Sequence, residues 1–191
     1  MLVLIKGAGD LATGTAVRLY RAGIKVVMTE VARPTAVRRT VAFSQCMYDG
    51  AAQVEGIAAR RAEDAGAARR ALERGEVPVL CDPEAAILRE LPFDGVVDAI
   101  LAKRNLGTAI TDAPVVLALG PGFTAGVDCH GVVETMRGHN LGRLLTRGSA
   151  APNTGVPGDV GGYTIQRIIR APADGVFEPL AAIGQRVEEG Q

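Results

Sequence analysis

The stretch LVLIKGAGDLATGTAVRLYRAGIKVVMTE, residues 2–30, decides the fold class of this chain. It opens with a continuous apolar run over residues 2–5, which is typical of a strand buried on both faces of a parallel sheet. Residues 11–22 carry the apolar spacing of a helix, and Gly23 follows as its C-cap. Residues 25–29 are largely apolar again and predict a second strand. The order strand, helix, strand predicts a βαβ unit at the start of the chain.

The turn between the first strand and the helix has the spacing of a phosphate-binding loop. Gly7 permits a tight turn, Gly9 lets the backbone approach a pyrophosphate, and Ala12 allows the helix to pack closely on the strand. The exposed N–H groups and the positive end of the helix dipole favour a phosphate there. Asp10 would repel an anion and is expected to cap the helix instead. The predicted nucleotide site comprises Gly7, Gly9, Asp10, Ala12, Thr13 and Gly14.

An acidic residue follows the second strand at the position where such sites bind ribose. Glu30 lies about 20 residues beyond the glycine turn, which suits the ribose hydroxyls of NAD. Arg33, Arg38 and Arg39 follow closely and could accept the 2′-phosphate of NADP, so NAD and NADP both stay open. A tight strand–helix turn that binds no ligand is the alternative interpretation of the motif.

The remainder of the chain continues the alternation of strands and helices and then becomes rich in glycine after residue 119. Strands are expected at residues 54–60, 77–81, 95–101 and 115–119, and helices at residues 64–74 and 83–91. This order predicts an α/β protein with a Rossmann-like, doubly wound parallel sheet. The expected domains are a nucleotide-binding domain over residues 1–148, a linker over 149–163 and a partial β-barrel over 164–191.

Two later loops carry further candidates for ligand binding. Lys103, Arg104 and Asn105 follow the strand predicted at residues 95–101, and cations at the carboxyl end of a strand suit a second phosphate-bearing group. A solvated surface turn is the alternative. The glycine-rich segment after the strand at residues 115–119 is expected to close over the ligand, and its candidate residues are Gly120 and Gly122.

Both histidines of the chain lie within residues 128–143. His130, Glu134 and His139 are candidate acid–base residues, and Asp128 with His130 are candidate metal ligands. No HExxH zinc motif is present, so the sequence leaves the metal content open. Polar side chains that hydrogen-bond irregular loops are the alternative.

The same segment also contains Arg137, Arg143 and Cys129. The two arginines are candidate anion-binding residues. Adjacency of Cys129 to His130 is poor evidence for a catalytic dyad, because activation needs spatial arrangement rather than sequence proximity.

Composition restricts the classes of partner. Hydrophobic residues make up 48% of the chain and the formal net charge is zero, so neither nucleic acid nor a membrane surface is an expected partner. No apolar run is long enough to span a bilayer. Three widely spaced cysteines predict reduced thiols in a cytoplasmic protein rather than a disulfide framework.

Six longer segments resemble one family. They are LIKGAGDLATG, PTAVRRTVAF, DAILAKRNLGT, LALGPGFTAGVDCH, VVETMRGHNLGR and PNTGVPG. Together they are similar to the YqeB-type proteins of the selenium-dependent molybdenum hydroxylase system, over nearly the whole chain. The resemblance implies an intracellular accessory protein whose partner is a hydroxylase apoenzyme or another maturation factor. It implies a role in maturation, or in handling molybdenum cofactor or selenium, and it assigns no catalytic residues.

The end of the chain has a resemblance of its own. Residues 171–177 and 183–191 look like the first half of a biotinyl/lipoyl-type barrel, in which glycines serve the turns between short strands. A carrier domain needs a modifiable lysine, and this segment has none. Because half a barrel leaves unpaired edges, we expect the native chain to continue past Gln191, and a homo-oligomer is compatible with such an edge.

These observations favour one function over two alternatives. The favoured function is a maturation factor that binds a small nucleotide-containing ligand, either NAD(P) or molybdopterin dinucleotide. An NAD(P)-dependent oxidoreductase, with an acid or base from the segment around His130, is the second hypothesis. A structural scaffold with a vestigial nucleotide turn is the third, and the sequence does not decide whether the protein is an enzyme.

Overall fold

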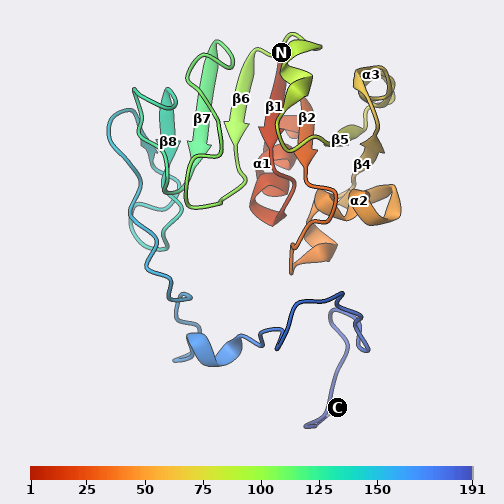
Figure 1. Cartoon of the computed structure of the whole chain (residues 1–191), viewed down its shortest axis with the longest axis vertical. Coiled ribbons are helices and arrows are strands. Elements are labelled where there is room, and N and C mark those ends of the chain that lie inside the picture. The colour runs from red at the N-terminus through yellow and green to blue at the C-terminus, as the bar shows by residue number, and fades with distance from the viewer. Residues whose placement is uncertain (191) are drawn as a thin grey trace. The chain divides into compact units, whose positions relative to one another are not determined.

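The computed structural model describes residues 1–190 and divides the chain into two compact units, Met1–Asn153 and a second unit from Thr154 onward (Figure 1). The first unit contains a nine-stranded sheet of order β3-β4-β5-β2-β1-β6-β7-β8-β9. The strands are β1 (Leu2–Lys6), β2 (Lys25–Glu30), β3 (Ala51–Val54), β4 (Ile57–Ala62), β5 (Val77–Cys81), β6 (Gly95–Asp98), β7 (Val115–Leu119), β8 (Gly131–Val133) and β9 (Leu144–Leu145).

The sheet is mixed, which corrects the expectation of a parallel sheet. Neighbouring strands from β4 to β8 are all parallel, whereas β3 and β9 pair antiparallel at the two edges. The two edge pairs differ from the rest of the sheet because the segments that join β3 to β4 and β8 to β9 are too short for a parallel crossover. The predicted strand at residues 115–119 coincides with β7, and the predicted strand at residues 77–81 coincides with β5.

The core lies on both faces of the sheet, as the unbroken apolar run of β1 predicts. Val3 and Ile5 pack in one cluster with α1 (Asp10–Arg21), whereas Leu4 packs in the opposite cluster with α3 (Ala65–Glu73). The period of two along a strand places successive side chains on opposite faces. The two helices therefore cover opposite faces of the sheet.

Helices are fewer than the sequence predicts. The helix expected over residues 83–91 is only a 3₁₀ turn, η3 (Ala86–Arg89). Ala85 adopts a left-handed conformation with φ 52°, which interrupts any continuous α-helix, and the Asp82 carboxylate accepts the N–H groups of Ala86 and Ile87. The helix expected over residues 64–74 does form as α3, with Asp64 as its N-cap.

The segment between β2 and α3 contains a hairpin that the sequence analysis missed. The single strand expected at residues 54–60 is two strands, β3 and β4, joined by Glu55 and Gly56. Both turn residues have positive φ, 49° and 80°, as a two-residue hairpin turn requires. Before β3 the chain forms η1 (Arg39–Val41), η2 (Phe43–Gln45) and the short α2 (Cys46–Asp49).

The second unit has little regular structure. Its described residues, 154–190, contain η4 (Ile165–Arg167) and an isolated bridge between Val160 and Tyr163, and no strand. The partial barrel expected over residues 164–191 is thus not confirmed, and Gln191 lies outside the described residues. No helix among the described residues is long and apolar enough to cross a membrane.

Candidate functional site

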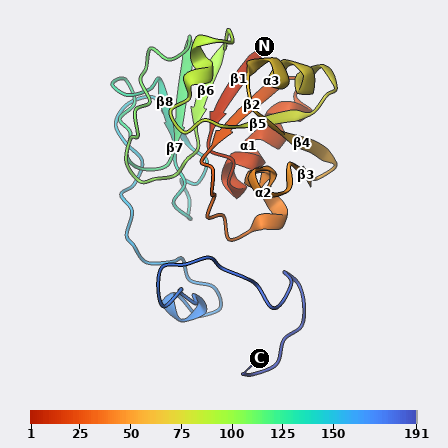
Figure 2. The same cartoon turned by 45° about the vertical axis from the view of Figure 1, so that its right-hand side comes forward.

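The glycine turn, Glu30 and the loop with Lys103 and Arg104 all follow the carboxyl ends of parallel strands, β1, β2 and β6 (Figure 2). From β1 the chain first builds one side of the sheet, through β2, and later crosses back to place β6 on the other side of β1. Strand order therefore reverses between β1 and β6. In open α/β sheets, ligands bind in the crevice at such a reversal. The glycine turn follows β1 at this point.

The two glycines of the turn serve different purposes. Gly7 has φ +94°, and a Cβ placed on it would lie 3.0 Å from the carbonyl oxygen of Ala99. Only glycine fits there without a shift of the backbone. Gly9 has ordinary backbone angles, φ −64° and ψ −177°, and a Cβ on it would meet nothing within 4 Å. The space above Gly9 is open to a ligand.

The first turn of α1 exposes unpaired hydrogen-bond donors. Gly9 is the N-cap and supplies no side chain to accept them. The backbone N–H groups of Asp10, Leu11 and Ala12 have no acceptor among residues 1–190. Ala12 is itself buried against the strands, as its place in the motif predicts. Together with the helix dipole, these donors favour an anion above Gly9.

Asp10 does not cap the helix, contrary to expectation. Its carboxylate instead pairs with Arg38, whose Nε lies 2.7 Å from Oδ2. This pairing offsets the negative charge that would otherwise repel an anion from the helix start. Arg33 and Arg39, from the same segment, use their side chains in no hydrogen bond or ion pair with a described residue. Their guanidinium groups remain available to a ligand.

Glu30 lies beside the glycine turn, as its position after β2 predicts. Its Oε2 accepts the N–H of Ala8 at 2.9 Å, and its Oε1 accepts the N–H of Val31 at 2.8 Å. Each oxygen retains a further lone pair, so the carboxylate can still accept a hydroxyl hydrogen. The residue thus braces the turn and remains in position for a ribose.

Thr13 is a structural member of the turn. Its Oγ1 donates to the carbonyl oxygen of Ala8 at 3.2 Å and accepts the N–H of Phe43 at 2.9 Å. The N–H of Ser44 donates to the same Ala8 oxygen at 2.8 Å. The segment from η1 to η2 is thereby fastened to the glycine turn. Thr13 was predicted to bind the ligand, whereas in the structure its hydroxyl hydrogen and one of its lone pairs are engaged within the protein.

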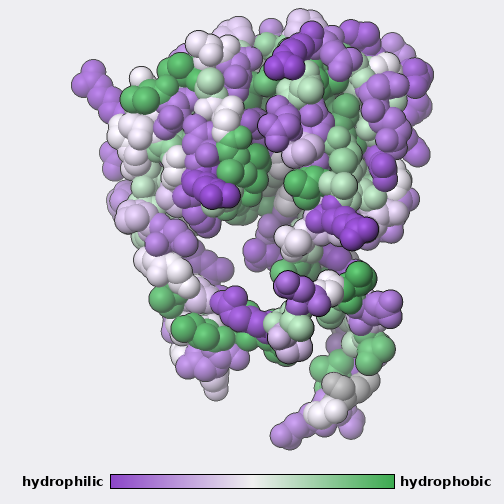
Figure 3. Space-filling view, viewed as in Figure 1, coloured by the Kyte–Doolittle hydropathy of each residue, from purple (hydrophilic) through white to green (hydrophobic). Residues whose placement is uncertain are grey.

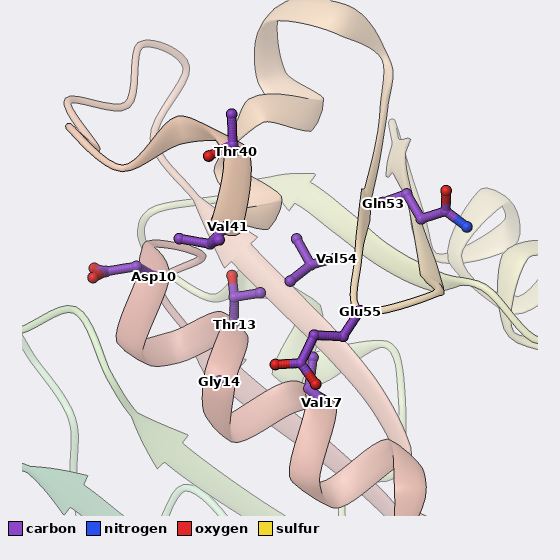
Figure 4. A pocket seen from close by; sticks show the side chains of 9 residues that line it. All are labelled: Asp10, Thr13, Gly14, Val17, Thr40, Val41, Gln53, Val54 and Glu55. Atoms are coloured by element: carbon purple, nitrogen blue, oxygen red, sulfur yellow. The ribbon is translucent and has the colours of Figure 1, made fainter. Parts of the chain in front are cut away.

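A groove of about 300 Å³ lies between α1 on one side and η1 and the β3–β4 turn on the other (Figure 4). Gly14 contributes to its floor, since a Cβ there would meet nothing within 4 Å. The Glu55 side chain extends over α1 near Gly14 and Val17, whereas the side chains of Asp10 and Gln53 point away from the centre of the groove. The full lining comprises Asp10, Thr13, Gly14, Val17, Thr40, Val41, Gln53, Val54 and Glu55. The groove flanks the glycine turn on the side away from β6.

The two later glycine positions hold the loop that carries the predicted cations. A Cβ on Gly122 would lie 2.6 Å from the backbone nitrogen of Arg104, and one on Gly120 would lie 2.7 Å from Thr135 Oγ1. Both glycines therefore have packing roles. The structure brings the turn after β7 against residues 103–104, which the sequence placed in separate clusters. Polar and apolar side chains mix on the surface over these strand ends (Figure 3).

The three residues of the predicted second phosphate site divide into two kinds. The side chains of Lys103 and Arg104 are exposed and contact no acidic group of the described chain. Asn105 is structural, because its Oδ1 accepts the N–H groups of Gly107 and Thr108 and its Nδ2 donates to the Thr108 carbonyl. The cations are free for a ligand, and Asn105 shapes the loop that presents them.

A buried hydrogen-bonded series of three side chains, two of them ionisable, lies at the same edge and was not predicted from the sequence. Lys6 Nζ donates to Thr108 Oγ1 at 2.6 Å, and Thr108 Oγ1 donates to Asp98 Oδ2 at 2.6 Å. All three side chains are buried. The sequence feature that could have revealed these residues is Lys6 itself, a charged residue at the end of an apolar strand directly before the glycine turn.

The candidate acid–base residues are not brought together. His130 precedes β8, where its Nδ1 accepts the N–H of Val116 at 3.0 Å, at the amino edge of the sheet. Glu134 follows β8 at the carboxyl edge, and its oxygens accept the N–H groups of Met136 and Ala151 at 2.7 and 2.8 Å. These hydrogen bonds lower the pKa of Glu134. The carboxylate is thus a clamp between two loops.

The remaining candidates of that segment are also apart. His139, Arg137 and Arg143 are exposed, and their side chains form no hydrogen bond or ion pair with a described residue. Asp128 Oδ2 accepts the N–H of Thr124 at 2.7 Å, within a turn at the amino edge. Among residues 1–190 no group of three or more His, Cys, Asp or Glu side chains is placed to hold a metal ion. Burial raises the pKa of the Cys129 thiol, which disfavours the thiolate.

Comparison with known proteins gives one informative relative. The chain is 54% identical over 189 residues to a protein of Escherichia coli (strain K12) named "Uncharacterized protein YqeB". The match covers 99% of this chain and 35% of the relative, so the chain spans about a third of that protein's length. No protein-family model and no solved structure matches the chain. The identity supports the likeness to YqeB-type proteins, whereas the relative's name assigns no activity and says nothing of selenium-dependent hydroxylases.

Proposed function

From the likeness to YqeB, we propose that this chain is an accessory protein for the maturation of selenium-dependent molybdenum hydroxylases. Its first unit binds a nucleotide-containing ligand, either NAD(P) or molybdopterin dinucleotide, through a Rossmann-type phosphate loop. One observation carries the binding proposal: the unpartnered first-turn N–H groups of α1 face open space above Gly9. A phosphate oxygen satisfies such donors and gains from the helix dipole.

Charge around the turn supports an anionic ligand. The Asp10 carboxylate is paired with Arg38, and the exposed cations Arg33, Lys103 and Arg104 come from loops at the carboxyl edge. Cations near a phosphate site strengthen binding through charge-assisted hydrogen bonds. The proposed site therefore has two parts: donors from the helix start, and exposed positive side chains from the neighbouring loops.

A Rossmann-like, doubly wound architecture is part of the proposal. Its support is the parallel core from β4 to β8, the cover of opposite sheet faces by α1 and α3, and the reversal of strand order between β1 and β6. The connections from β6 to β7 and from β7 to β8 contain no α-helix, unlike a full set of βαβ units. We place the ligand at the reversal, where this fold class binds nucleotides.

Glu30 gives the proposal its ribose contact. The carboxylate is fixed by Ala8 and Val31 and keeps lone pairs for ribose hydroxyl groups. Arg33 is the candidate for binding a 2′-phosphate. Comparing the affinities for NAD and NADP therefore tests whether Glu30 or Arg33 sets the cofactor preference. Molybdopterin dinucleotide carries a pyrophosphate that would suit the same turn.

The first experiment is a thermal-melting panel with NAD, NADP, their reduced forms, FAD, CTP, GTP and molybdopterin dinucleotide. A ligand present at 100 times its dissociation constant stabilises the native state by about 2.7 kcal/mol, which raises the melting midpoint by several degrees. A response to the pterin dinucleotide alone supports cofactor handling, and turnover of NAD(P)H with a small substrate would instead identify an oxidoreductase. No response to any ligand would contradict the binding proposal.

The proposed partner is a hydroxylase apoenzyme in the cytoplasm. The three cysteines are all unpaired, in keeping with a reducing compartment. We expect the tagged chain to co-purify with such a hydroxylase, and its deletion to lower hydroxylase activity without lowering the amount of apoenzyme. Unchanged hydroxylase activity in the deletion strain would contradict the maturation role and leave ligand binding to be judged by the melting panel.

A further inference from the structure

Lys6 occupies an unusual place for a charged side chain. It ends β1 directly before Gly7, and it is only 3% exposed. Its ammonium group has three hydrogens to donate, and Thr108 Oγ1 accepts one of them at 2.6 Å. No other group among the described residues accepts the remaining two. A buried cation with two unused donors calls for an acceptor from outside the chain.

Within residues 1–190, Asp98 is the only carboxylate linked to this ammonium group, and the link is indirect. Lys6 and Asp98 are register partners on β1 and β6, yet Thr108 Oγ1 stands between their charged groups. Asp98 Oδ1 accepts the N–H of Ile100, and Oδ2 accepts the Thr108 hydroxyl. Asp98 therefore compensates the charge of Lys6 through one hydroxyl and leaves two ammonium hydrogens unbonded.

The loop that follows β6 and leads to Thr108 has a strained backbone. Residues 99–108 connect β6 to Thr108 and lie against the glycine turn, as the contact of Gly7 with Ala99 indicates. Leu101 and Lys103 have φ 60° and 64°, a left-handed conformation that residues with a side chain rarely adopt. Such strain gathers at ligand clamps, where the surrounding structure maintains it.

We infer that Lys6 is a ligand-binding residue whose ammonium group holds a phosphate oxygen at the reversal between β1 and β6. This inference rests on the proposed nucleotide binding and adds a buried cation to its phosphate site. The phosphate is bound by the first-turn N–H groups of α1 on one side and by Lys6 on the other. Thr108 and Asp98 position the ammonium group, and Lys103 lies on the same loop.

The chain suits a direct test, because it contains only three lysines: Lys6, Lys25 and Lys103. Protein labelled with ¹⁵N-lysine gives at most three side-chain ammonium signals, which are assigned by single Lys→Met variants. The probes are inorganic pyrophosphate and NAD. We expect the Lys6 signal to shift on titration while the Lys25 signal stays in place, since Lys25 opens β2 at the amino edge of the sheet.

Affinity provides the second readout. Lys6→Met should weaken pyrophosphate binding about tenfold, the loss expected for one charge-assisted hydrogen bond. Lys25→Met, the matched control, should bind as the native protein does. Because Lys6→Met leaves Asp98 without its cation, the double variant Lys6→Met/Asp98→Asn restores charge balance and separates misfolding from loss of a ligand contact.

The outcomes distinguish this inference from the function on which it rests. Native affinity in a folded Lys6 variant, or a Lys6 signal that does not move while pyrophosphate binds, would overturn the role of Lys6 alone. Failure of the native protein to bind pyrophosphate, NAD or any other nucleotide would overturn the proposed function together with it. Loss of affinity in both Lys6 variants, with melting midpoints near the native value, supports the inference.

Discussion

The carboxylate of Glu30 accepts a hydrogen bond from the backbone N–H of Ala8, with 2.9 Å between Oε2 and nitrogen. This bond joins the end of β2 to the centre of the glycine turn. The second oxygen of Glu30 accepts the N–H of Val31, so one side chain fixes the backbone just after both β1 and β2. The residue that the sequence assigns to a ribose therefore also sets the shape of the phosphate loop.

Replacement of Glu30 by alanine should lower stability as well as ligand affinity. Two hydrogen bonds to a charged acceptor are lost and the N–H of buried Ala8 is left unpaired, which costs about 1–3 kcal/mol. Urea denaturation measures the free energy of unfolding. The control is Glu63→Ala, which removes an exposed pair with Arg61 and should cost less than about 1 kcal/mol. Equal costs for the two variants would contradict the bracing role.

Gly7→Ala should be among the more damaging substitutions in the turn. The new Cβ would require a left-handed backbone and would press on Ala99 and Ile100 at 3.0 Å, so we expect a loss of about 2 kcal/mol or more. Gly50→Ala is the matched control: its φ is +76°, but a Cβ there meets open space, and strain alone costs about 1 kcal/mol. Similar melting midpoints for the two variants would show that the contact with Ala99 is unimportant.

Glu134 predicts a dependence of stability on pH. Hydrogen bonds from Ala151 and Met136 lower the pKa of this carboxyl in the folded protein, so its contribution is present above the unfolded pKa and is lost as pH falls through the lowered folded pKa. Urea titrations from pH 7 to pH 3 should show the native protein losing more stability below about pH 4.5 than Glu134→Gln does. Parallel curves for the two proteins would refute this clamp.

Thiol reactivity should separate the three cysteines. Burial raises the pKa of Cys46 to about 11 and also raises that of buried Cys129, whereas Cys81 is exposed. A thiol reagent at pH 8 should therefore modify Cys81 quickly and the other two only after denaturation. Mass spectrometry of the native protein and of Cys81→Ser gives the count of modified sites. Rapid labelling of Cys129 in the folded protein would contradict the structure around β8.

His130→Ala should affect stability and leave ligand binding unchanged. The imidazole Nδ1 accepts the Val116 N–H at the amino edge of the sheet, away from the glycine turn, and loss of this bond costs about 1 kcal/mol. Denaturant titration and nucleotide binding are measured on the same preparation. A selective loss of ligand affinity, at native stability, would return His130 to the candidate site residues.

Local patterns predicted the start of the sheet well, because the residues that specify it are adjacent. The run before Gly7 and the helical spacing after it correspond to β1 and α1, with boundaries shifted by one residue. The hairpin turn was missed because Glu55-Gly56 lacks the Asn-Gly or Asp-Gly pair that usually marks it. The strands β8 and β9 are only three and two residues long and lie in a glycine-rich stretch without periodicity.

The site was predicted in part, for a similar reason. Spacing placed Gly9 and Glu30 at the same edge, and the structure brings them there. Four positions separate His130 from Glu134, which on a helix would put them side by side, but a strand carries them to opposite edges of the sheet. Lys6 was missed because its burial depends on Asp98 and Thr108, far along the chain.

The most direct test of the proposed phosphate site is nucleotide binding to Gly9→Val, measured by calorimetry with the ligand that responds in the melting panel. A Cβ on Gly9 meets no protein atom within 4 Å, so the fold should be preserved while the added side chain fills the space of the phosphate. Gly175→Val, whose Cβ also meets nothing within 4 Å, is the control. We predict that Gly9→Val melts near the native midpoint and loses binding, whereas Gly175→Val binds normally. Native affinity in folded Gly9→Val would contradict the account.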